Sequence, residues 1–346
     1  MTNKINHALS LLSNPTVAEY LDLMHDTEPP PLFHVWSLLS AASACMTRRC
    51  WFDMGPIRIM PNQYIMLVGA PGVRKSTAVS FAKRMLSEVK GIRLAPNSTG
   101  GHMQGLITAM CGPRSVGMNP EAGSEDAAIQ EALDAMNGIG FAGVPEEVEL
   151  ELQPTHVQNR SALYVAEGEL TSFLGIKRDD FINFLGDMWD KSGEAEHVYQ
   201  LKREKIRIGL PCLNLIGGIT PMHITTYLPP QAIGQGFTSR VILVFSEYRK
   251  RVPWPDPLGE KKFAQFKQLM GWIFADKEGP FEHTREAKRR IIDLYDYKVA
   301  IEDARFIHYA ERRQTHMIKA AMALCALRMD NIVTAQDVDD AHALLV

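Results

Sequence analysis

The stretch Tyr64-Ile-Met-Leu-Val-Gly-Ala-Pro-Gly-Val-Arg-Lys-Ser76 joins an apolar run to a short loop and the start of a helical pattern. Such a run is typical of a strand that is buried on both faces of a parallel sheet. A helix is expected to follow from about Lys75 to Val89. A loop between a strand and a helix directs its backbone N–H groups and the helix N-terminus toward one position, which favours the binding of an anion there. The sequence therefore predicts a phosphate-binding loop.

Three residues at the end of this loop, Arg74, Lys75 and Ser76, determine its expected chemistry. Lys75 would reach the terminal phosphates of ATP, and the Ser76 hydroxyl would hold Mg²⁺. Arg74 stands where the pattern G-x-x-x-x-G-K-[ST] has its second glycine; with a positive φ it costs about 1 kcal/mol, and its charge near the phosphates would partly compensate. The alternative is a Gly-Pro turn before a helix that begins Arg-Lys-Ser. The predicted nucleotide ligands are Gly69, Ala70, Pro71, Gly72, Val73, Arg74, Lys75, Ser76 and Thr77.

Three further apolar runs, at 162–166, 212–217 and 241–245, alternate with helical patterns. This alternation predicts a doubly wound α/β core. The first run ends in Glu167-Gly-Glu169, on what we expect to be a strand neighbouring the loop strand. Glu169 is the candidate general base, and Glu167 is a carboxylate on the Mg²⁺ side or the alternative base. Either acid could instead be a solvated residue at a strand end.

The next two strands carry polar residues at their ends. Thr220 follows the strand that we expect beside the acidic one, where it could sense the γ-phosphate or be an ordinary loop residue. Arg240 precedes the last core strand, at the expected edge of the sheet. There it could reach the nucleotide of a neighbouring subunit, or it could cap the glycine-containing turn before it.

A basic segment lies between the acidic strand and Thr220. Tyr199–Arg207 fits a hairpin with a basic tip, which is typical of an element that contacts a nucleic-acid backbone, although a charge run can also be a solvated face. The candidate DNA-binding residues are Lys202, Arg203, Lys205 and Arg207.

The composition divides the chain into three parts. Residues 1–60 form a mostly helical segment that ends in a short hairpin around Gly55-Pro56, residues 61–248 form the ATPase core, and residues 258–346 form a helical lid. Residues 112–159 are predicted to be an acidic insertion in the core. In the C-terminal part, expected to be helical throughout, Thr334 is a predicted N-cap. Arg312 and Arg313 could reach the nucleotide, but we favour a solvated face beside an apolar helix core.

The 346 residues carry a net charge of −3, with 46% apolar and 22% charged residues, as in ordinary globular proteins. Between Arg114 and Arg160, nine acids and two bases give −7, so the rest of the chain carries +4, which does not oppose binding to phosphates. No apolar run reaches the ~18 residues of a membrane helix. The five scattered cysteines and the polar start predict a cytoplasmic protein, in the bacterial host if the chain is phage-encoded.

Together these segments resemble the P-loop ATPases of phage and plasmid replication modules, and the order of motifs is similar to the AAA+ and minichromosome-maintenance helicases. The resemblance includes Phe33–Trp36, Pro61–Tyr64, the loop with Arg-Lys-Ser, Asp187–Asp190 and Gly236–Arg240. It implies an ASCE or AAA+-like P-loop NTPase fold, use of ATP and Mg²⁺, and a homo-oligomeric ring, hexameric by family precedent. It also implies single-stranded DNA in the channel and an arginine finger from Arg240, with a primase or another replication protein as a further partner.

The first functional hypothesis is thus an oligomeric ATPase that moves along single-stranded DNA and unwinds duplex DNA during replication. The alternatives are a helicase loader or another DNA-handling AAA+ ATPase, and a nucleotide-binding interaction protein without robust turnover. DNA-stimulated hydrolysis separates the ATPases from the last of these. Unwinding of a forked duplex without another helicase separates the helicase from the loader.

Overall fold

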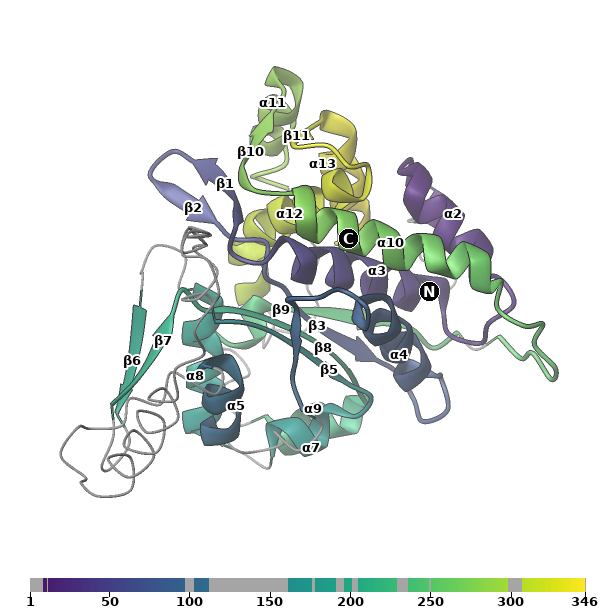
Figure 1. The fold of residues 1–346 in the computed structure, drawn as a ribbon, viewed down its shortest axis with the longest axis horizontal. Helices are drawn as coiled ribbons and strands as arrows, with labels where there is room; N and C mark the ends of the chain where they lie inside the picture. The colour runs from purple at the N-terminus through teal and green to yellow at the C-terminus, as the bar shows by residue number, and fades with distance from the viewer. Residues whose placement is uncertain are drawn as a thin grey trace, which may run out of the picture.

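The protein is described here by a computed structural model (Figure 1) that covers residues 9–10, 12–96, 103–111, 161–175, 178–190, 196–200, 205–228, 236–248, 250–297 and 307–345. Its centre is a five-stranded sheet in which every pairing is parallel. In spatial order the strands are β4 (Arg93–Leu94), β5 (Ala162–Glu167), β8 (Cys212–Ile219), β3 (Tyr64–Val68) and β9 (Val241–Phe245). The predicted core strands are confirmed, and the short edge strand β4 is an addition.

Helices cover both faces of this sheet, so the core has three layers (Figure 1). Along β3, Ile65 and Leu67 join one apolar cluster, whereas Tyr64, Met66 and Val68 join the other. This division follows from the two-residue period of a strand. The first cluster includes α3 (Pro31–Met46), α4 (Lys75–Leu86), α10 (Glu260–Asp276) and α12 (His308–Leu327). The second includes α5 (Met103–Cys111), α7 (Leu170–Leu174), α8 (Asp179–Asp190) and α9 (Pro221–Tyr227).

A second sheet joins the N-terminal and C-terminal parts of the chain. The expected hairpin around Gly55 is present as β1 (Cys50–Met54) and β2 (Ile57–Ile59). Strand β1 also pairs in parallel with β10 (Gly279–His283), which in turn pairs with β11 (Ile332–Val333). The expectation that everything after Glu260 is helical is therefore wrong. Strand β10 escaped detection because Phe281 is its only buried residue and gives no apolar run.

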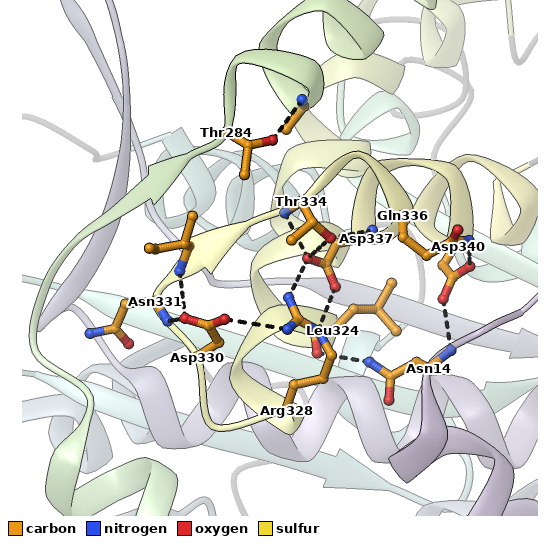
Figure 2. Close-up of polar contacts among 12 residues, drawn as sticks. Asn14, Thr284, Leu324, Arg328, Asp330, Asn331, Thr334, Gln336, Asp337 and Asp340 are labelled. Carbon is orange, nitrogen blue, oxygen red and sulfur yellow. Dashed lines mark hydrogen bonds and ion pairs between the residues drawn. The ribbon is translucent and has the colours of Figure 1, made fainter.

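Polar contacts fasten the last helix to the N-terminal segment (Figure 2). The Thr334 side chain caps α13 (Ala335–Leu344), and the reciprocal bond from its backbone N–H to Asp337 completes a capping box, which confirms the predicted N-cap. Asp340 on the same helix accepts a 3.0 Å hydrogen bond from the Asn14 N–H group. Asn14 in turn caps α2 (Pro15–Leu23). Helix α11 (Arg285–Asp293) precedes α12 in the chain and contacts α13.

The basic segment forms the expected hairpin, with β6 (Glu196–Gln200) antiparallel to β7 (Lys205–Gly209). Gln200 pairs with Lys205, and Val198 pairs with Arg207. Lys202 and Arg203 lie outside the described residues, as does the acidic insertion at 112–159. The DNA-binding role of this hairpin stays a prediction.

Within the described ranges, no helix combines the length and the apolar character that crossing a bilayer requires. Four cysteines in these ranges are free and buried: Cys45, Cys50, Cys212 and Cys325.

Candidate functional site

The loop after β3 has the backbone conformation that its glycine pattern demands. Gly72 has a φ of +85°, and Arg74 has φ +57° and ψ +32°, which is the left-handed region. Arg74 is thus a side chain where the position suits glycine, and the strain of about 1–2 kcal/mol is present. Helix α4 begins at the next residue, so its first N–H groups, which have no partner within the helix, border the loop.

Lys75 is buried behind this loop and folds back onto it. Its Nζ donates to the carbonyl oxygens of Gly69 at 2.8 Å and of Ala70 at 3.0 Å. Burial lowers the pKa of Lys75, and the carboxylate of Glu169 opposes that shift. The exposed Ser76 follows on the first turn of α4. A buried ammonium group and a free hydroxyl therefore lie side by side at the carboxyl end of β3.

Glycines bring the acidic strand end into contact with this loop. A Cβ atom on Gly168 would lie 3.1 Å from the Ser76 Cβ atom, and one on Gly218 would lie 2.9 Å from the Lys75 Cβ atom. Strand β8 lies between β3 and β5, so the acidic strand is the next but one, not the immediate neighbour that the sequence suggested. Because Gly218 at the end of β8 and Gly168 after β5 have no side chains, the acidic loop can approach the loop after β3 across this extra strand.

The two candidate acids differ in their surroundings. Glu169 is exposed at the start of α7, and its charge acts on Lys75. Glu167 is half-buried; burial raises its pKa, and the opposing charge is that of Lys83, two turns further along α4 from Lys75. Glu169 is therefore the acid whose charge acts on Lys75.

Two residues after β8 complete this edge of the sheet. Thr220 lies at the N-cap position of α9, where its side chain makes no capping hydrogen bond. One turn later, His223 places Nδ1 3.7 Å from the Glu169 Oε1 atom. A lone histidine gave no signal in the sequence, because only the fold brings α9 beside α7.

A cleft of about 900 Å³ opens beside the loop. Its walls come from the segment before α3, from the outer side of α4 and from the linker before α10; they include Glu28, Thr77, Phe81 and Pro253. The Arg74 guanidinium is paired with Glu28 at this cleft. This carboxylate offsets the positive charge that was expected to act on the phosphates, and Glu28 was missed because it lies 46 residues from Arg74.

Arg240 lies at the opposite end of the sheet. It precedes β9, the edge strand on the β3 side, and Tyr64 at the start of β3 pairs with Val241. The five-residue strand separates Arg240 from the loop by about 16 Å at 3.3 Å per residue. Arg240 therefore cannot reach the loop of its own chain. Its Nη1 donates to the Gly236 carbonyl at 2.6 Å, so the expected turn-capping contact is present.

The basic residues of α12 also lie away from the loop. Arg312 donates to Asp190 Oδ1 at 2.8 Å. Arg313 is buried and donates to the Leu294 carbonyl at 3.3 Å, so the prediction of a solvated basic face is wrong for this residue. The apolar residues 320–327 are buried, as expected for the core of the helix.

The arrangement fits a magnesium-bound polyphosphate. Mg²⁺ is usually held by one or two protein groups, phosphate oxygens and water, so it needs no dense ligand cluster. Over the described part of the chain, no group of three or more His, Cys, Asp or Glu residues is arranged to hold a metal ion. Ser76 supplies an exposed hydroxyl, and Glu167 supplies a carboxylate at the end of β5, the next strand but one.

The fold and the site together define a class: a three-layer α/β protein with a parallel central sheet and a glycine-containing strand-to-helix loop at its carboxyl edge. No model of a known protein family matches the chain, and no curated protein does. Among solved structures, a full-length MCM homologue from Methanopyrus kandleri is similar, with a TM-score of 0.43 and 14% identity. The match covers 99% of this chain and 60% of that chain, so this protein spans about three fifths of its length. A likeness of this degree assigns neither family nor activity.

Proposed function

We propose that this chain is an AAA+-like P-loop ATPase that handles DNA as a homo-oligomer. One observation carries the proposal: the loop after β3 and the acidic loop after β5 touch at Gly168 and Ser76, across the intervening strand β8. That contact supports one site that contains a phosphate-binding lysine and a carboxylate near it. Unwinding of DNA in replication, in a ring that is hexameric by family resemblance, is the narrower form of the proposal.

Each residue has a distinct role in this proposal. Lys75 leaves the carbonyl oxygens of its own loop and binds the β- and γ-phosphates. Glu169 accepts the proton of the attacking water, and Thr220 contacts the γ-phosphate. Ser76 would hold Mg²⁺, with Glu167 on the same side, and the bound ion would neutralise phosphate charge. The loop residues from 69 to 77 supply backbone N–H groups, and the cleft beside Thr77 receives the nucleoside.

Arg240 acts on the nucleotide of a neighbouring subunit. The separation of about 16 Å from its own loop, spanned by a full strand, supports a role between subunits. A guanidinium group there would offset the negative charge that develops on the γ-phosphate. The basic hairpin β6–β7 would contact single-stranded DNA.

A second candidate function is supported by the loop itself. Arg74 is strained and paired with Glu28, and Lys75 is bound to two carbonyl oxygens. A bound nucleotide must replace the contacts of both Arg74 and Lys75 with contacts to its phosphates, which favours slow turnover. On this view the chain is a nucleotide-dependent interaction protein.

The test is steady-state ATP hydrolysis with and without single-stranded DNA, at low and moderate salt. The proposal expects stimulation by DNA and loss of hydrolysis in Lys75→Ala. The matched control is Lys90→Ala, an exposed lysine just beyond α4, which keeps the wild-type rate.

Each other outcome rejects a defined part of the proposal. Hydrolysis that DNA does not change would reject DNA handling, and nucleotide binding without hydrolysis would establish the second candidate. If Lys75→Ala hydrolyses ATP like wild type, the loop assignment is wrong. Unwinding of a forked duplex by the protein alone then separates a helicase from a helicase loader.

A further inference from the structure

A single carboxylate, Asp190, holds two partly buried arginines, Arg240 and Arg312, at the amino edge of the central sheet. Asp190, the last residue of α8, accepts a 2.8 Å hydrogen bond at Oδ2 from Arg240 Nε, and Arg240 Nη2 donates to the same oxygen. Its other oxygen, Oδ1, accepts a 2.8 Å hydrogen bond from Arg312 Nη1. Three elements distant in sequence, α8, the turn before β9 and α12, therefore meet at Asp190.

The contacts of Arg240 leave one part of its guanidinium available. The group has five N–H donors in a rigid fork. Nε and Nη2 each donate once to Asp190, and Nη1 donates once to the Gly236 carbonyl. One N–H on Nη1 and one on Nη2 remain beyond these three bonds, and guanidinium N–H groups are the donors that bind phosphate oxygens. Asp190 therefore binds the Arg240 guanidinium and leaves two of its N–H donors for an anion.

Asp190 is itself fixed from a second direction. The Arg312 guanidinium carbon lies 5.2 Å from the centre of the Trp189 ring, and Arg312 binds the Asp190 oxygen that Arg240 does not use. Trp189 is buried, with 5% of its surface exposed. A carboxylate that follows a buried indole and is bound through both oxygens has little freedom to move. Arg240 is therefore attached to an acceptor that α12 also binds.

We propose that Asp190 is a positioning residue, which orients the Arg240 guanidinium toward the terminal phosphate of a nucleotide bound to a second copy of this chain. The inference rests on the proposed function, since it needs Arg240 to act between subunits. The inference adds that Asp190 is the acceptor that sets the direction of the Arg240 side chain. Arg312 takes part by fixing Asp190, so the C-terminal helix α12 helps to aim Arg240.

The first measurement is ATP hydrolysis by full-length Asp190→Asn. Without the negative charge at position 190, the Arg240 guanidinium loses its ionic partner and moves from its position. A displacement of about 1 Å at a reacting centre lowers the rate by up to ~100-fold. We expect kcat to fall by about 10- to 100-fold with the KM for ATP changed less than about twofold, since Arg240 acts on the developing charge. The matched control is Asp187→Asn, an exposed acid on the same helix, which keeps the wild-type rate.

Mixed subunits then separate positioning from folding. Asp190→Asn keeps its own Glu169, and Glu169→Gln keeps its own Arg240, so an interface between them has one complete site. Random mixing of these two impaired variants in equal amounts should restore about one quarter of the wild-type rate, because about half of the interfaces have an intact Glu169 side and about half of those also have an intact Asp190–Arg240 side. Mixing Asp190→Asn with Arg240→Ala should restore nothing, because both lack the same half-site.

The other outcomes overturn defined statements. If Arg240→Ala is inactive but Asp190→Asn matches or exceeds wild type, Asp190 does not position the arginine and the proposed function stands. If Asp190→Asn is inactive and Glu169→Gln does not rescue it, the role of Asp190 is structural. If Arg240→Ala itself hydrolyses ATP like wild type, the action between subunits fails, and the proposed function loses that part.

Discussion

Replacing Gly218 by alanine tests whether close backbone contact between β8, the acidic loop and the phosphate loop builds the site. An added Cβ atom would lie 2.5 Å from the Gly168 carbonyl oxygen and 2.9 Å from the Lys75 Cβ atom. Neither neighbour is the end of a flexible side chain. Since Cβ contacts under 3.0 Å are essentially never found, the acidic loop must move by about 0.5 Å or more.

The size of the effect follows from this displacement. Overpacking of a dense region costs about 1–3 kcal/mol of folding free energy. The same shift moves Glu169 relative to Lys75, and displacements approaching 1 Å in an active site lower the rate by up to ~100-fold. We therefore expect Gly218→Ala to unfold at lower denaturant concentration and to hydrolyse ATP about 10- to 100-fold more slowly, with nucleotide binding reduced less.

The assays are chemical denaturation, nucleotide binding and steady-state hydrolysis on the same preparation. Gly271→Ala is the matched control, since Gly271 lies in α10 and an added Cβ meets nothing within 4 Å. That variant should gain up to about 1 kcal/mol from helix propensity and keep its rate. Wild-type stability and wild-type hydrolysis in Gly218→Ala would refute the reasoning, because the loops would then not depend on this contact.

Three further predictions concern other parts of the chain. Burial lowers the pKa of Lys319 from 10.5 to about 7, so above pH 7 the unfolded chain binds more protons and stability rises with pH. From pH 7 to 8.5 the free energy of unfolding should rise by about 2 kcal/mol because of Lys319. Urea denaturation of Lys319→Met should show no such rise, and an equal rise in that variant would contradict the prediction. Thr334→Ala should lose about 1 kcal/mol through its capping box, measured by the same method; an unchanged midpoint would mean that the cap adds no stability. Reversing Lys202 and Lys205 to Glu should weaken binding to single-stranded DNA and flatten its salt dependence; equal affinity would return the hairpin to a solvated face.

The elements that the sequence predicted well are those whose residues carry the signal themselves. Strand β3 is apolar at every position because both faces of a central parallel strand are buried. The loop and α4 follow from the glycines and the helical pattern after it. Thr334 is recognisable as an N-cap because its partner Asp337 is three residues away.

Other features had no local signal. Strand β10 has one buried residue and gains its strand conformation from parallel pairing with β1, more than 200 residues earlier. Arg313 is charged and follows another arginine, yet it is buried because α12 packs against α13. A solvated face was the expectation from charge alone, and tertiary packing reversed it.

By itself the sequence determined a parallel α/β core, the position of the loop between β3 and α4, and the strand ends that carry Glu167, Glu169 and Thr220, because burial and loop geometry act on neighbouring residues. Only the tertiary structure decided that β8 lies between the loop strand and the acidic strand, that Arg74 is paired with Glu28, and that Asp190 holds Arg240. These contacts join segments 46 or more residues apart. Pairings at that separation depend on how whole layers pack, which local patterns do not encode.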